Sequence, residues 1–196
     1  MTHEELPLAV IFAEVAAFLA ARPDAVLFGA HAVNAYANVE RMTQDVGVLT
    51  TDGRALADDL RGHLAHRFHI AVRVREVEPG TGFRVYQLRD ARNRHLVDVR
   101  QCPTLPPFVE ISGIRVVELV ELIAMKVASL HARRGREKGL SDRLDLHRLL
   151  NAFPELRVVD GAVAERLRVR GDEALQPLWA EVVGERVEAD EEGDDP

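Results

Sequence analysis

The feature that most constrains the fold is the stretch of residues 27–49, LFGAHAVNAYANVERMTQDVGVL. A short apolar run ends there at Gly29, and residues 30–37 are good helix formers. This order predicts a strand, a small-residue turn and a helix. Apolar residues return at 45–49, which predicts a second strand.

The turn and the second strand also carry the first candidate functional groups. A helix that begins behind a small-residue turn offers unpaired backbone N–H groups and the positive end of its dipole, which suit a phosphate. Because side chains alternate across a strand, Asp45 and Gly47 point to one side while Val46 and Val48 point to the other. A carboxylate at the head of a strand beside such a turn indicates a metal site.

The rest of the chain predicts alternating helices and strands, with apolar residues at helical spacing in some segments and at a period near two in others. The predicted helices cover residues 6–21, 54–68 (capped by Thr51-Asp52) and 118–133, followed by a helix capped by Ser141 and two short helices within 156–187, with Asp160 as a candidate cap. The predicted strands are a three-stranded meander, 70–77, 83–88 and 95–99, and one edge or connecting strand, 108–116.

Composition predicts one compact body with a short extension. The chain has 196 residues, of which 47% are hydrophobic, and Cys102 is its single cysteine, so no intramolecular disulfide forms. A signal-peptide pattern and a membrane-spanning apolar run are both lacking, which predicts a soluble, cytoplasmic protein. The net charge of -7 is concentrated in residues 185–196, which predicts a disordered acidic tail.

Three further acidic residues and one lysine are candidate site residues. In the strand 95–99, Asp98 opposes Val97 and Val99, so it can face a site while the valines face the core. Lys126 lies on the apolar stripe of its helix, and Asp142 and Asp145 lie near the apolar face of the next helix. Either these three form a buried ion pair that fixes helix packing, or they share a functional cleft.

The loop 133–138 contains four basic residues in six positions. It is either a solvated connection or a clamp on a triphosphate or an RNA acceptor, since arginine forks match phosphate oxygens. The sequence leaves both interpretations open.

Taken in order, these motifs resemble the DNA polymerase β-like nucleotidyltransferase superfamily, in particular the minimal nucleotidyltransferases of the AbiEii/MenT toxin type. The resemblance covers roughly residues 25–150 and departs from the family at Gly47, where the second metal-binding carboxylate is expected. Ala30 also stands where Gly or Ser is usual. The matching motifs are Gly29-Ala30, Arg41-x-Thr43-x-Asp45-x-Gly47, Val97-Asp98-Val99, Leu122-Ile123-x-x-Lys126, the basic loop and Asp142-x-x-Asp145.

The resemblance implies an α+β fold, a nucleotidyltransferase-like mixed sheet flanked by helices and followed by a C-terminal helical part. It implies an α/β core at 1–115, a helical part at 116–184 and the tail at 185–196. The implied catalytic residues are Asp45, Asp98, Lys126, Asp142 and Asp145, and the implied metal ligands are Asp45 and Asp98. The implied nucleotide-binding residues are Gly29, Ala30, His31, Arg41, Thr43 and Lys126.

The implied activity is transfer of a nucleotide from an NTP to an RNA, such as tRNA, or to a protein, with Mg2+ or Mn2+ as cofactor and a cognate antitoxin as a partner. Gly47 opens two alternatives. One is a catalytically inactive protein of the same fold that binds nucleotide or a protein partner, and the other is a variant of an active enzyme that has lost its second carboxylate.

Overall fold

The computed structural model describes residues 7–38, 43, 45–90 and 92–187. The chain divides into two compact units, Met1–Leu122 and Ile123–Pro196, which are described one after the other. The boundary falls inside helix α4. Arg41 and residues 188–196, most of the predicted tail, lie outside the described residues.

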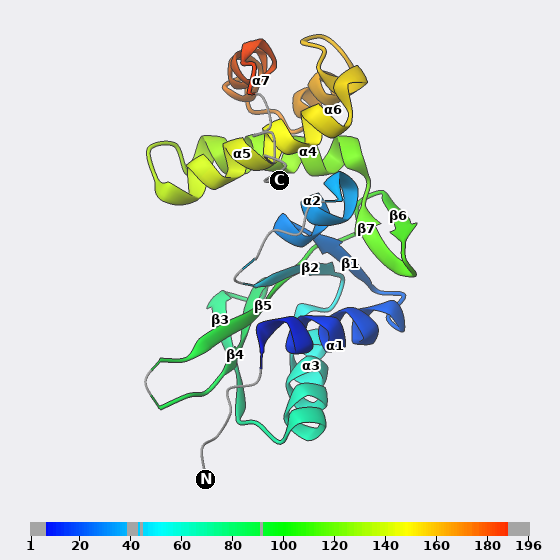
Figure 1. Ribbon diagram of the computed structural model, residues 1–196, viewed down its shortest axis with the longest axis vertical. Helices are drawn as coiled ribbons and strands as arrows, with labels where there is room; N and C mark the ends of the chain where they lie inside the picture. The colour runs from blue at the N-terminus through cyan, green and yellow to red at the C-terminus, as the bar shows by residue number, and fades with distance from the viewer. Residues whose placement is uncertain (1–6, 39–42, 44, 91, 188–196) are drawn as a thin grey trace, which may run out of the picture. The chain divides into compact units, whose positions relative to one another are not determined.

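Unit 1 is built on a mixed sheet that has seven strands within the described residues (Figure 1). Their order across the sheet is β3-β4-β5-β2-β1-β7-β6. The pairs β2/β5 and β1/β7 are parallel, and the other neighbours are antiparallel. The strands are β1 (Ala25–Phe28), β2 (Val46–Thr50), β3 (Val72–Glu78), β4 (Gly82–Gln87), β5 (Arg94–Gln101), β6 (Phe108–Ile111) and β7 (Ile114–Val117).

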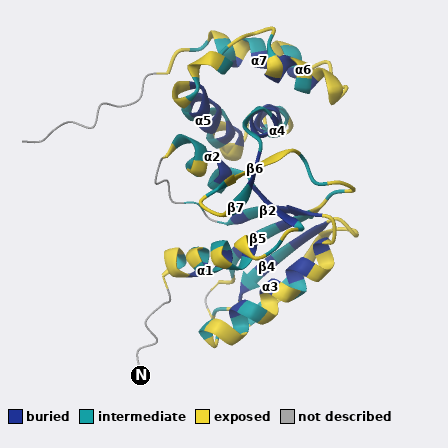
Figure 2. Cartoon of the chain, turned by 90° about the vertical axis from the view of Figure 1, so that its right-hand side faces the viewer, coloured by how far each residue is buried: buried dark blue, intermediate teal, exposed yellow. Residues whose placement is uncertain are grey.

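Helices α1 (Leu8–Ala20) and α3 (Gly53–Phe68) contact each other, and each helix exposes one of its sides to solvent (Figure 2). The apolar stripe predicted for α3 is buried, with Leu56, Leu60 and Leu64 fully enclosed. The predicted cap is confirmed, since the Asp52 carboxylate accepts a hydrogen bond from the backbone N–H of Ala55 at 3.0 Å.

Helix α3 packs on the face of the sheet that carries Phe83, Val85, Val97 and Val99. It contacts β3, β4 and β5, and a Cβ added to Gly53 at its start would lie 3.0 Å from the Phe83 ring. All four side chains are buried. The residues between them on β4 and β5, Arg84 and Asp98, therefore point to the opposite face. Helix α2 (Ala30–Ala37) follows β1 directly.

One prediction for unit 1 is wrong. Residues 108–116 form a hairpin rather than a single strand, because the chain turns back at Ser112 and Gly113, both with positive φ. Gly113 adopts that conformation without steric cost, and it terminates the first strand after four residues.

Unit 2 is helical. It contains most of α4 (Leu119–Ala132), then α5 (Glu137–Ala152), the short 3-10 helix Pro154–Leu156, α6 (Ala162–Val169) and α7 (Leu175–Gly184). Trp179 is fully buried and donates its indole N–H to the Val158 carbonyl at 3.2 Å. The two short helices predicted within 156–187 are confirmed.

Two predicted caps in unit 2 are wrong. Helix α5 begins four residues before Ser141, so the Ser141 hydroxyl lies inside the helix near the Glu137 carbonyl. Asp160 pairs with Arg168, and Gly161 is the N-cap of α6. In both cases a residue type that favours caps makes a different local contact. Within the described residues, no helix is long and apolar enough to cross a membrane.

Candidate functional site

The predicted carboxylate strand and the strand that contains Gly47 lie side by side. Gly47 pairs with Asp98 across the parallel strands β2 and β5, and it also pairs with Phe28 on β1. Asp98 pairs in turn with Arg84 on β4. Directly paired residues share a face of the sheet, so these four positions form one row across four strands. We call Phe28, Gly47, Asp98 and Arg84 the central row.

The side-chain position at Gly47 is filled by a neighbour. A Cβ added to Gly47 would lie 2.9 Å from Cε1 of Phe28, 3.1 Å from its Cδ1 and 3.0 Å from its carbonyl oxygen. Such distances are closer than van der Waals contact allows. The Phe28 ring therefore occupies the space into which a side chain at position 47 would project.

Asp98 is held by two arginines. Nε of Arg84 donates to one carboxylate oxygen at 3.2 Å, and Nε of Arg100 donates to the other at 3.1 Å. The Asp98 side chain is 14% exposed, whereas those of Arg84 and Arg100 are 40% and 43% exposed. The Arg100 guanidinium also lies over the Phe28 ring, 5.4 Å from its centroid. We call Arg84, Asp98 and Arg100 the arginine clamp.

Asp45 lies immediately before β2 and contacts His95 of β5. Its Oδ2 is 3.1 Å from Nδ1 of His95, while Nε2 of His95 is 3.1 Å from the Val97 carbonyl oxygen. Burial lowers the pKa of His95, and the neighbouring Asp45 and Asp98 carboxylates oppose that shift. The pairing of β4 with β5 is irregular between Val85 and Tyr86, next to His95, and such irregularities re-aim side chains.

The turn before α2 has the conformation that the sequence requires. Gly29 has φ 76°, a region that favours glycine, and its carbonyl accepts the backbone N–H of Val33 at 3.1 Å. His31 lies near the start of α2, with its Nε2 in contact with the Thr43 hydroxyl and its ring edge-on to Phe12. Burial lowers the pKa of His31, and the charge of the Asp45 carboxylate partly opposes that shift. The structure thus brings His31, Thr43 and Asp45 into one neighbourhood.

A two-ion metal site does not fit these residues. Gly47 supplies no ligand, and the Phe28 ring occupies its side-chain space. Both oxygens of Asp98 already accept hydrogen bonds from arginines, which would repel a divalent cation. Across the described part of the chain, no group of three or more His, Cys, Asp or Glu side chains is arranged to hold a metal ion. These contacts argue against two ions, and the assignment of Asp45 and Asp98 as metal ligands stays a prediction.

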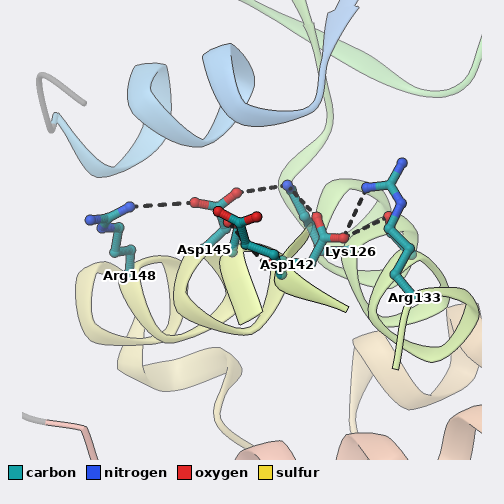
Figure 3. A network of polar contacts seen from close by, with 8 residues as sticks. Lys126, Arg133, Asp142, Asp145 and Arg148 are labelled. Atoms are coloured by element: carbon teal, nitrogen blue, oxygen red, sulfur yellow. Dashed lines mark hydrogen bonds and ion pairs between the residues drawn. The ribbon is translucent and has the colours of Figure 1, made fainter. Parts of the chain in front are cut away.

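The second candidate group lies within unit 2 and forms a direct ion-pair network (Figure 3). Nζ of Lys126 donates to Asp142 at 2.9 Å and to Asp145 at 2.7 Å. The second oxygen of Asp142 accepts from Ser129 at 2.9 Å and from Arg133 at 3.0 Å.

Burial shows what this network does for the helices. The side chains of Lys126, Asp142 and Asp145 are 9%, 5% and 2% exposed. They therefore lock α4 to α5, because an unpaired buried charge would be costly. This geometry supports the ion-pair interpretation, and a role of the three residues in catalysis stays a prediction.

The basic loop is shorter than the sequence suggested, because Glu137 and Lys138 form the first turn of α5. Arg133 belongs to the Lys126 network, and Arg134 lies 3.4 Å from Glu181 of α7. Arg136 and Lys138 are exposed.

Sequence reasoning missed four residues of unit 1 that the structure places at the site: Phe28, Arg84, His95 and Arg100. A signal for the arginines was present, since Arg84 and Arg100 stand among core residues on strands that alternate apolar and polar side chains. Their contact with Asp98 depends on strand register, which the sequence does not give.

Comparison with known proteins identifies the architecture. No family model matches the chain, and no curated protein matches it. Among solved structures, it is similar to the Megavirus polyadenylate synthase, with 15% identity and a TM-score of 0.61, over 75% of this chain and 32% of the other. The chain thus spans about a third of that protein.

Two further likenesses cover most of both chains. A putative nucleotidyltransferase from H. pylori shares 14% identity with a TM-score of 0.60, over 93% of each chain. ANT(2")-Ia, solved in complex with adenylyl-2"-tobramycin, shares 13% identity with a TM-score of 0.51, over 88% of this chain and 98% of the other. At such low identity these likenesses establish the fold, and the mixed sheet with its flanking helices is that of the nucleotidyltransferases.

Proposed function

We propose that the chain is a nucleotidyltransferase-like protein that takes a nucleoside triphosphate at the edge of unit 1 where β2 and β5 adjoin the Gly29 turn. The observation that carries this proposal is the juxtaposition of Asp45 with His95 and of Asp98 with Gly47 on parallel neighbouring strands. His31 and Thr43 lie against the same region. A turn with backbone N–H groups at a helix start suits the phosphates.

The finer features of the proposal follow from the sequence motifs. The chain is of the AbiEii/MenT toxin type, its acceptor is an RNA such as tRNA or a protein, and a cognate antitoxin restrains it. Gly29, Ala30, His31, Arg41 and Thr43 line the nucleotide. Because a two-ion site does not fit the described residues, we assign no step to a metal ion, and we expect turnover to be weak.

A second candidate function is favoured by position 47. The Phe28 ring in that space and the two arginines on Asp98 leave the site without its usual set of carboxylates. A protein with this arrangement can retain nucleotide binding, or bind a protein partner through the same fold, without transferring a nucleotide. This is the catalytically inactive alternative.

The experiment that separates the two functions incubates the purified chain with each α-labelled NTP, Mg2+ and bulk tRNA or a protein extract. The chain is compared with Gly47→Asp, with Gly47→Asp combined with Phe28→Ala, and with Asp45→Ala. Label transfer by the unsubstituted chain that Asp45→Ala abolishes supports the enzyme. Transfer by the double variant alone supports the inactive alternative. If no form binds or transfers any NTP in a direct titration, the proposed function is wrong.

A further inference from the structure

The arginine clamp gives the candidate site a positive outer surface. One carboxylate, Asp98, lies beneath two guanidinium groups that are about three times as exposed as it is. The three side chains together carry a net positive charge. The contacts with Asp98 use the Nε–H of each arginine, and a guanidinium has further N–H donors on its outer nitrogens.

The clamp is also ordered by its surroundings. Arg100 is held between Asp98 and the face of the Phe28 ring. Arg84 is positioned by Asp98 and by a hydrogen bond to Tyr86. A guanidinium that is already fixed loses little conformational freedom when it binds a ligand, so pre-ordered arginines bind anions more tightly than free ones.

The arginines that disfavour a metal ion also supply positive charge in its place. Phe28 fills the side-chain space at position 47, and Arg84 and Arg100 donate to both oxygens of Asp98. Arginine forks match phosphate oxygens, which makes them the protein groups best suited to neutralise a polyphosphate.

We propose that Arg84 and Arg100 bind the polyphosphate of a nucleoside triphosphate at this site without a divalent cation, and that Asp98 positions the two arginines rather than holding a metal. This inference rests on the proposed function, since it concerns the same nucleotide.

The inference predicts an unusual sign for a change at Asp98. If Asp98 were a metal ligand, Asp98→Asn would abolish nucleotide binding. In the clamp, Asp98→Asn removes a negative charge next to the phosphates while the amide oxygen can still accept one hydrogen bond. The affinity for nucleotide should then stay within about threefold of that of the unsubstituted chain or increase. The removal of a negative charge beside the phosphates offsets the weaker positioning of the arginines.

The test is a calorimetric titration of the full chain with ATP, GTP, CTP and UTP in turn, and with inorganic tripolyphosphate, in EDTA and again in Mg2+. For a nucleotide that binds, we expect dissociation constants in EDTA and Mg2+ within about threefold of each other. Weaker binding of tripolyphosphate than of the nucleotide shows that the base or ribose is also held, and equal binding assigns the site to polyphosphate as such. Both results support the clamp.

Arg84→Gln and Arg100→Gln should each weaken binding in EDTA by about tenfold, as expected for the loss of one charge-assisted contact. The matched control is Arg61→Gln on α3, which packs on the other face of the sheet and whose side chain is 51% exposed. It should change affinity by less than about twofold. Thermal unfolding of each variant checks that it is folded, so that a loss of binding is not a loss of structure.

Three results would overturn the inference. Binding that occurs only with Mg2+ and is lost in folded Asp98→Asn would show that Asp98 serves a metal, and the proposed function would survive. Unchanged binding in both folded arginine variants would show that the clamp does not contact phosphate. Absence of binding to any nucleotide in either buffer would defeat the proposed function as well, so the two failures are distinguishable.

Discussion

Substitutions at Gly47 test whether the Phe28 ring excludes a side chain from the middle of β2. The φ angle of Gly47 lies outside the left-handed region, so the backbone there accepts other residues and the cost comes from contact alone. An added Cβ lies 2.9 Å from the ring and 3.0 Å from the Phe28 carbonyl oxygen. The ring must rotate or the strands must separate before any side chain fits.

The expected magnitude follows from the cost of overpacking. Gly47→Ala should destabilise the chain by about 1–3 kcal/mol, the range for inserting an atom into a packed site. Gly47→Asp should cost a further fraction of a kcal/mol, because its carboxylate would lie opposite Asp98 in the strand pairing. In a Phe28→Ala background the ring contact is gone while the contact with the backbone carbonyl oxygen of residue 28 remains, so the cost of Gly47→Ala should fall by about 1–2 kcal/mol. The coupling energy between the two positions is then about 1–2 kcal/mol.

The assay is equilibrium unfolding in urea of the four proteins of this double-mutant cycle. An equal slope of the unfolding free energy against urea concentration in all four is the check on two-state behaviour. Gly62→Ala is the matched control, because that glycine lies within α3 and a Cβ there has nothing within 4 Å. It should stabilise the chain by about 0.5–1 kcal/mol. The reasoning is refuted if Gly47→Ala costs the same with and without the Phe28 ring.

Two further measurements address buried titratable side chains. Lys126→Met should destabilise unit 2 by about 3–5 kcal/mol in urea unfolding, because Asp142 and Asp145 would stay buried without their cation. Arg148→Met, which removes a longer contact of 3.5 Å to Asp145, should cost less than about 1 kcal/mol, and equal losses would contradict the proposed packing role. Burial lowers the pKa of His31, so the unfolded chain binds a proton near its ordinary pKa of 6.5 more readily than the folded chain does. Stability should therefore fall as the pH drops below about 6.5, and His31→Gln should reduce that loss between pH 7.5 and pH 5.5; an unchanged loss would assign it to other groups.

Much of the fold follows from local sequence pattern. Alternation predicted the strands of the meander, and the spacing of Leu56, Leu60 and Leu64 predicted α3 together with its Asp52 cap. These features depend on neighbours within a few residues, and backbone periodicity makes such relations readable from the sequence. The mistaken caps at Ser141 and Asp160 mark the limit of local pattern, since both residues found other partners.

The sequence also determined which residues could take part in a site. Val97 and Val99 placed Asp98 on the opposite face of its strand, and helical spacing placed Lys126, Asp142 and Asp145 near the apolar faces of their helices. Of the two interpretations left open there, the structure supports the ion pair. The interpretation of Gly47 as the position of a missing carboxylate comes from the motif resemblance alone and stays a prediction.

Only the tertiary structure decided what surrounds these groups. Phe28 reaches the space at Gly47, and Arg84 reaches Asp98, because the register of β1, β2, β5 and β4 aligns them in the central row. A shift of one residue in any pairing would turn these side chains to the other face of the sheet. Register depends on the packing of the whole sheet, and for that reason the contacts of Asp98 with Arg84 and Arg100 could be seen only in the folded chain.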